Sequence, residues 1–202
     1  MTKLQKRGLV LISLGLILLL ASLALHLAAE MQDRMARKNA EVLLQQLELN
    51  RTPVDTPVCL PEAPPSAETA MPEKEYLGYS MIGTIRIPSV GIELPVLSSW
   101  SYELLNVAPC RYSGSIPGKN MIIMGHNYKS HFTPLHEVMV GADVIFEDVN
   151  GTKYSFRVAE ITILHKNEGE KLPSGYPLTL FTCTPGGQNR AIVRCEAITG
   201  QT

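Results

Sequence analysis

The chain has 202 residues, which is enough for one domain of ordinary size plus attachments. Its 18 Lys and Arg residues against 19 Asp and Glu give a formal net charge of −1, which argues against nucleic acid as a partner. Four cysteines are too few to build a disulfide scaffold. The composition is therefore that of an ordinary globular protein, apart from one unusual apolar segment.

That segment covers residues 8–29 and contains no charged side chain. A helix of this length spans the hydrocarbon core of a bilayer, and the run is longer than the ~7–15 apolar residues of a signal peptide. No clean small-x-small cleavage site follows it. We predict a cytoplasmic tail over residues 1–7 and an uncleaved single-pass anchor over 8–29. The acidic Glu30 and Asp33 beyond the span favour an extracytoplasmic C-terminal part.

Two further segments separate this anchor from the rest of the chain. Residues 30–50 are rich in helix formers, without Gly or Pro, and are predicted to continue the membrane helix as a juxtamembrane stalk. Residues 51–75 contain six prolines and form a predicted linker that decouples anchor and domain. Cys59 within it is either an incidental exposed thiol or the partner of an intermolecular disulfide. Apolar side chains on the stalk could form a self-association stripe: Met31, Met35, Val42, Leu43 and Leu47.

Residues 76–202 are predicted to form the globular domain. Short β-type runs alternate there with turn residues, and the one helix candidate is 101–107. Asn150-Gly151 suits a type I′ hairpin turn between two of the runs. The pattern predicts a mainly β fold, either an antiparallel sandwich or a closed barrel. The expected strands are 83–88, 91–96, 120–124, 143–146, 154–158, 161–164, 178–182 and 191–198.

Three residues carry the chemistry. Cys183 ends an apolar strand next to a turn, a position that displays a thiol on a rigid support. His126 also follows an apolar strand, and Gly125 before it relieves crowding where the backbone turns. Cysteine and histidine are the minimum set for thiol catalysis, with the imidazole carrying the proton. Arg190 opens the last strand and could hold a substrate carbonyl or a developing oxyanion.

These residues stand in motifs that resemble the sortase family. Thr179-Leu-Phe-Thr-Cys183, followed by Arg190-Ala-Ile-Val, is similar to the family's T-L-x-T-C…R signature. The segments 83–96, 116–118 and 120–126 follow the family's order and spacing, so the resemblance covers about residues 78–198. The stretch after His126 looks closer to class B or class D-like members than to the housekeeping class.

The resemblance implies a closed eight-stranded β-barrel with short helices and a cysteine transpeptidase. Cys183 would attack a peptide bond in the C-terminal sorting signal of a secreted protein, and an amine of a peptidoglycan precursor or a pilin would resolve the thioacyl intermediate. His126 would give a proton to the leaving amine, and Arg190 would clamp the oxyanion or the substrate. The family implies no cofactor and a place on a Gram-positive-type cell membrane.

Alternative interpretations of single residues remain open. His131 and His136, with Cys183 or Cys110, could be imagined as a zinc site, although their spacing matches no common metal motif. Cys110 and Cys195 could pair as an extracytoplasmic disulfide. Arg194 lies on the same strand face as Arg190 and is its rival for the clamp role.

Two other classes of function are also open. An L,D-transpeptidase is a β protein with Cys and His, but Cys183 does not stand in its S-x-G-C setting. A non-enzymatic, membrane-anchored β-domain could serve adhesion or surface assembly. Loss of activity in Cys183→Ala would separate an enzyme from a binding domain.

Overall fold

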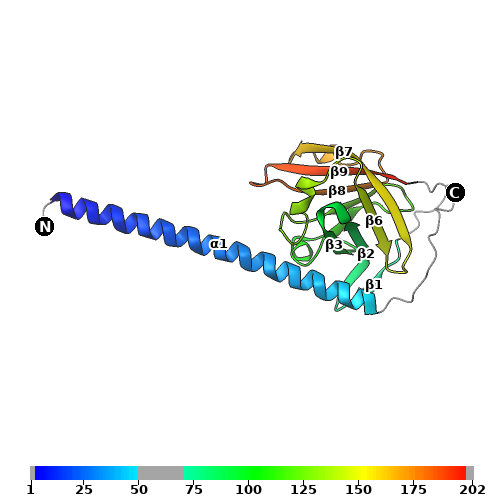
Figure 1. Cartoon of the computed structure of the whole chain (residues 1–202), viewed down its shortest axis with the longest axis horizontal. Coiled ribbons are helices and arrows are strands. Elements are labelled where there is room, and N and C mark those ends of the chain that lie inside the picture. The colour runs from blue at the N-terminus through cyan, green and yellow to red at the C-terminus, as the bar shows by residue number, and fades with distance from the viewer. Residues whose placement is uncertain (1–2, 50–70, 199–202) are drawn as a thin grey trace.

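The structure, a computed structural model, describes residues 3–49 and 71–198 as one long helix followed by a mainly β domain (Figure 1). Cys59 and most of the predicted linker lie outside the described residues. The long helix is α1 (Lys3–Leu49), and the short helices are η1 (Pro88–Val90), α2 (Tyr102–Leu105), η2 (Thr133–Glu137) and η3 (Gly169–Lys171). The strands are β1 (Lys74–Tyr76), β2 (Tyr79–Ile87), β3 (Ile92–Leu97), β4 (Cys110–Ser113), β5 (Met121–Met124), β6 (Asp143–Asp148), β7 (Lys153–His165), β8 (Leu178–Cys183) and β9 (Asn189–Ala197).

The strands close into a barrel. They follow the order β1-β2-β3-β4-β5-β8-β9-β7-β6, and β2 also pairs with β6. β1 pairs with β2 only and stays outside the closed ring. The pairs β3–β4 and β5–β8 are parallel and the others antiparallel. The closed eight-stranded barrel with short helices is therefore confirmed.

Gly83 allows this closure. β2 has a register irregularity between Met81 and Gly83, the kind of bulge that bends a strand. A Cβ atom on Gly83 would lie 2.1 Å from the carbonyl oxygen of Glu147 on β6. Any side chain at this position would push β2 and β6 apart and open the ring.

The hairpin between β6 and β7 forms as predicted, but its turn is of another type. Within the turn only Gly151 has a positive φ, whereas a type I′ turn needs two such residues. The Asp148 carboxylate instead accepts hydrogen bonds from the backbone N–H groups of Asn150 and Thr152, at 2.8 and 2.9 Å. The Asp148 carboxylate therefore stabilises this turn, and Asn150 does not adopt the positive φ that a type I′ turn would require.

The strand predictions differ from the structure in three places. The expected strands 154–158 and 161–164 are one strand, β7, with a register irregularity between Val158 and Glu160. β1 and β4 were not predicted, because three or four residues are too short to show an alternating pattern. The buried Met71 shows that the packed unit begins before the predicted start at Tyr76.

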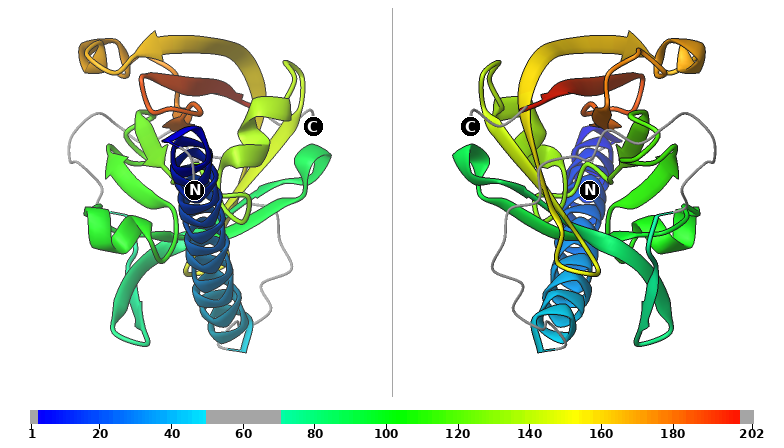
Figure 2. Two further views of the ribbon diagram at one scale, coloured as in Figure 1. Left: turned by 90° about the vertical axis from the view of Figure 1, so that its left-hand side faces the viewer. Right: turned by 90° about the vertical axis from the view of Figure 1, so that its right-hand side faces the viewer.

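α1 has two parts with different surroundings. Residues 11–29 are exposed, whereas the later part passes beneath the barrel in Figure 1, and the end views of Figure 2 place its C-terminal end below the strands. Four of its side chains are at most 2% exposed: Ala36, Ala40, Leu43 and Leu47. Their 4-3-4 spacing forms one helix face, and the small alanines allow close approach to the barrel.

The structure therefore differs from a stalk that is decoupled from the domain. Leu43 and Leu47 pack with Leu97, Leu105 and other apolar side chains on the outside of the barrel. The predicted self-association stripe is only half right, because Met31, Met35 and Val42 are exposed and lie off the buried face. Periodicity pointed to an apolar face, but the partner of that face is the chain's own domain.

Candidate active site

The three residues predicted to carry the chemistry lie on neighbouring strands. Cys183 is the last residue of β8 and pairs directly with Arg190 on β9. β5 runs parallel to β8, with Met124 paired to Phe181. The backbone N–H of Gly125 then donates to the Phe181 carbonyl oxygen at 3.1 Å, so the chain continues beside β8 as it reaches His126. The fold thus brings His126, Cys183 and Arg190 to one end of three adjacent strands.

Cys183 and Arg190 lie on the outer face of the barrel. An apolar layer covers this face, separate from the barrel interior, and includes Leu172 next to η3. On β8 and on β9 a member of this layer lies two positions from the site residue, which places both on one side of the sheet. These pairs are Phe181 with Cys183 and Ile192 with Arg190, whereas His126 lies two residues past the end of β5.

Cys183 differs from the other two described cysteines in its surroundings. It is half-buried, whereas Cys110 and Cys195 are fully buried in the middle of apolar clusters. Burial raises the pKa of the Cys110 and Cys195 thiols to about 12, which keeps both protonated and inert. All three are free thiols, so the possible disulfide between Cys110 and Cys195 is not formed.

His126 is held by the loop that follows it. Its ring stacks on Tyr128 with the centroids 4.7 Å apart, and the Tyr128 hydroxyl donates to Asn106 Oδ1 at 2.9 Å. A Cβ atom on Gly125 would lie 2.5 Å from the Phe132 ring, so glycine is needed before His126. Burial lowers the pKa of the His126 imidazole, which favours the neutral ring.

Arg190 and Arg194 have different partners although they share a strand face. Arg190 Nη1 donates to the carbonyl oxygens of Gly187 and Asn189, at 3.0 and 3.1 Å, in the turn between β8 and β9. Arg194 is four residues further on, where it pairs with Glu160 at 3.0 Å and donates to the Lys171 carbonyl oxygen at 2.9 Å. Arg190 lies beside Cys183, and Arg194 fastens the η3 segment.

A groove of about 190 Å3 leads along the outer face to Arg190. Aromatic side chains form one wall, with Trp100 5.5 Å from Tyr112 and Tyr112 5.4 Å from Phe181 between ring centroids. The segment from Leu164 to Leu172 forms the opposite wall. A groove with aromatic and charged lining that ends at Arg190, the strand partner of Cys183, suits a peptide with side chains of mixed character.

The remaining histidines do not assemble a metal site. His131 is 1% exposed, behind His126 and against α1, whereas His136 is exposed on η2. Across residues 3–49 and 71–198, no three His, Cys, Asp or Glu residues are grouped as metal ligands would be.

Sequence reasoning missed the residues that shape the site around the three reactive groups. Tyr128 could have been suspected, because it is an aromatic residue two positions after His126 in a short loop. Trp100, the single tryptophan of the chain, directly precedes the expected helix 101–107 and received no role in the site. No pattern in the sequence indicated that α1 reaches the loop after His126.

Comparisons with known proteins agree with the geometry. A family model of the sortase domain matches residues 85–198, which is more than half of the chain. Sortase C1 of Streptococcus agalactiae is 26% identical, with a TM-score of 0.54, over 60% of this chain and 69% of that chain.

Two further solved structures are similar in fold. Sortase A of Corynebacterium diphtheriae is 23% identical, with a TM-score of 0.55, over 61% of this chain and 63% of its own. The Clostridium perfringens sortase D5 transpeptidase is 21% identical, with a TM-score of 0.53, over 58% of this chain and 79% of its own. No curated protein sequence matches the chain significantly. The family match and the closed barrel agree, and the chain belongs to the sortase family of cysteine transpeptidases.

Proposed function

We propose that Cys183 is the nucleophile of a membrane-anchored transpeptidase that cleaves the C-terminal sorting signal of secreted proteins. The acyl group passes to an amine of a peptidoglycan precursor or of a pilin. The observation that carries the proposal is the convergence of Cys183, His126 and Arg190 at one end of the adjacent strands β5, β8 and β9.

In the first half-reaction the Cys183 thiol gives its proton to neutral His126, and the resulting thiolate attacks the scissile carbonyl carbon while the carbonyl π electrons move to oxygen. Arg190 stabilises this oxyanion, since a guanidinium is permanently cationic and donates several hydrogen bonds. Within the described residues no acceptor engages Arg190 Nη2, so its N–H groups are available to substrate. The oxyanion collapses, the carbon–nitrogen bond breaks, and the leaving amine takes a proton from His126.

In the second half-reaction His126 accepts a proton from the incoming amine instead of donating one to a leaving amine. The acceptor amine attacks the thioester and gives a proton to neutral His126, and the Cys183 thiolate leaves as the new amide forms. Burial lowers the pKa of His126, which makes the neutral base available for this step. A thioester keeps enough acyl reactivity for an amine to compete with water.

The groove beside Arg190 is the proposed binding site for the sorting signal. Trp100, Tyr102 and Tyr112 offer flat apolar surfaces to substrate side chains, and the groove reaches Arg190, which pairs with Cys183 across the two strands. A substrate bound along the outer face would place its scissile bond at the strand ends.

The membrane anchor supports the proposed location. Of the described residues, one helix, α1, is long and apolar enough to cross a membrane. In the proposed topology residues 1–7 are cytoplasmic, 8–29 span the bilayer and the barrel lies outside. Secreted substrates and cell-wall amines are found on that side.

The test is peptide turnover. The full chain in detergent micelles is incubated with a library of sorting-signal peptides and an amine, and the products are identified by mass spectrometry. We expect a thioacyl adduct on Cys183 and a transpeptidation product, both absent in Cys183→Ala. An adduct on Cys110 or Cys195, or full turnover by Cys183→Ala, would overturn the assignment.

Arg194 provides a matched control for Arg190. Loss of an oxyanion donor costs about 10²–10³ in rate, so Arg190→Ala should lose that much, with partial rescue by Arg190→Lys. Arg194→Ala should keep its rate and lose stability, because it removes the bonds to Glu160 and Lys171. A folded and fully active Arg190→Ala would move the clamp to another residue.

A further inference from the structure

The loop after His126 is docked on the juxtamembrane half of α1. The backbone N–H of Ser130 donates to Asp33 Oδ1 at 3.0 Å, and the Ser130 hydroxyl donates to the same oxygen at 2.9 Å. The hydroxyl also lies 3.2 Å from the Asp33 carbonyl oxygen. Next to this contact, Lys129 pairs with Glu30 at 3.2 Å. The two partners are 97 residues apart in sequence, so the contact ties the anchor to the catalytic domain.

This loop is a closely bonded unit that includes His126 itself. The backbone N–H of Phe132 donates to the His126 carbonyl oxygen at 3.1 Å, and the N–H groups of His131 and Thr133 donate to the Tyr128 carbonyl oxygen. The Tyr128 ring then stacks on the His126 ring and contacts His131, with centroids 5.4 Å apart. A displacement of Ser130 would therefore reach His126 through Tyr128 on one side and Phe132 on the other, each two residues from Ser130.

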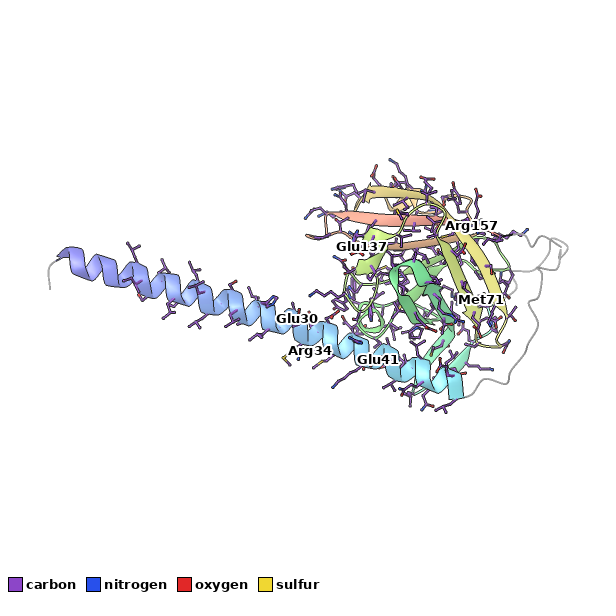
Figure 3. All side chains as sticks on the ribbon, in the orientation of Figure 1. Glu30, Arg34, Glu41, Met71, Glu137 and Arg157 are labelled. Carbon is purple, nitrogen blue, oxygen red and sulfur yellow. The ribbon has the colours of Figure 1, made fainter. Side chains whose placement is uncertain are left out.

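The helix also covers the far side of the loop. The His131 side chain is 1% exposed, and Ala36 of α1 lies near its ring. Asp33 is about one helical turn before Ala36, so the contact with Ser130 and the contact with His131 lie on the same helix face. Figure 3 labels Glu30 where α1 meets the barrel, with Arg34 and Glu41 further along the helix.

We propose that Asp33 is a positioning residue for His126: the juxtamembrane part of α1 holds the 127–133 loop and so sets where the imidazole lies. The inference rests on the proposed role of His126 in proton transfer. In this proposal α1 helps to position an active-site residue in addition to attaching the domain to the membrane.

Asp33 is the residue expected to dominate this contact. Its carboxylate accepts two hydrogen bonds in a part-buried position, and such charge-assisted bonds are roughly twice as strong as neutral ones. The Lys129–Glu30 pair is more exposed, with 77% and 35% of the side chains accessible, and exposed pairs contribute little. A catalytic group that moves by about 1 Å can lose a large part of its rate, up to about a hundredfold.

The experiment compares four forms of the full chain in detergent micelles: wild type, Asp33→Ala, Asp33→Asn and Glu41→Ala. Asparagine keeps an oxygen that accepts both bonds from Ser130, so it is the conservative variant. Glu41 is the matched control, since it is an exposed acid on the same helix that pairs with Arg37 at 2.8 Å. The kcat and KM for a sorting-signal peptide are measured, together with the NMR signal of the ¹³C-labelled His126 ring.

We expect Asp33→Ala to lower kcat at least about tenfold with KM unchanged, and to shift the His126 ring signal. Asp33→Asn should restore most of kcat, and Glu41→Ala should match wild type. The inference is overturned if Asp33→Ala keeps both its kcat and its His126 signal, or if Glu41→Ala loses as much.

The NMR measurement distinguishes a failure of this inference from a failure of the proposed function. If wild type and Cys183→Ala turn over no peptide, the proposed function fails, and the His126 signal of Asp33→Ala still decides the positioning. If Asp33→Ala unfolds, Ser130→Ala replaces it, because it removes only the hydroxyl donor. An unshifted His126 signal in that folded variant also contradicts the proposal.

Discussion

The two halves of α1 are one continuous helix in two different environments. Residues 11–29 expose uncharged, mostly apolar side chains on every side and contact no part of the barrel. Residues 30–49 carry charges on their outer faces and bury one stripe, from Ala36 to Leu47, against the domain. An all-round apolar surface needs lipid, whereas a single apolar stripe needs a protein partner. The comparison shows that amino-acid composition identifies the first half of α1, whereas only the periodicity of the apolar residues identifies the second half.

The largest effect should come from removing one half or the other. A chain that begins at Ala29 loses only the membrane span and should unfold with wild-type free energy. A chain that begins at Met71 loses all of α1 and should be about 5 kcal/mol less stable or fail to fold, since it exposes the surface that four side chains cover. Urea unfolding followed by circular dichroism measures both. Equal stability would show that the docked half contributes nothing.

Single leucine substitutions test the same difference between the two halves of α1. Leu43→Ala or Leu47→Ala should each cost about 3–4 kcal/mol, because both side chains are at most 2% exposed and leave a cavity. Leu19→Ala, at a position that is 70% exposed in the first half, should leave the stability of the barrel unchanged. The measurement is pulse proteolysis of the full chain in micelles. A loss in Leu19→Ala as large as in Leu43→Ala would contradict the division.

Acid should loosen the docked half through His131. Burial, with the nearby His126 charge, lowers the pKa of His131 from 6.5 to about 4. Neither ring nitrogen makes a hydrogen bond among the described residues, although carbonyl groups of Ala36 and Val107 lie near enough to favour the charged ring slightly.

The direction of this change in stability with pH follows from the pKa of His131 in the unfolded and in the folded chain. The unfolded chain protonates near pH 6.5 and the folded chain only near 4, so this contribution is complete above pH 6.5 and is lost as the pH falls. We expect a loss of roughly 2–3 kcal/mol between pH 7 and 4 that His131→Gln does not show. Unfolding free energies of both proteins across this range provide the measurement. An identical pH slope in both would remove His131 as the cause.

The smallest effect is expected at the edge of the docked half. Glu30→Ala removes an exposed ion pair with Lys129 and should cost less than about 1 kcal/mol, with the difference disappearing at high salt. A double-mutant cycle with Lys129→Ala measures the coupling. A coupling of several kcal/mol would mean that the pair is far more buried than its exposed fractions show.

Much of the reactive site was predictable because its parts are local in sequence. Cys183 and Arg190 flank one short turn between two strands, and His126 follows a strand with the glycine that Phe132 requires. The resemblance to sortases supplied the closed barrel and the roles of these residues, which spacing alone could not. The aromatic groove was not predictable, since Trp100, Tyr112 and Phe181 meet only when β4 and β8 take their places around the barrel.

The sequence by itself determined the long uncharged segment, the β character of the domain and which side chains are candidates for the chemistry. Each of these depends on a run of neighbouring residues: an uncharged stretch, short alternating strands, or a motif. Only the tertiary structure decided that the stalk docks on the barrel and that Asp33 meets Ser130. Contacts between residues so far apart in sequence leave no local pattern, because they form only after the chain has closed the loop between them.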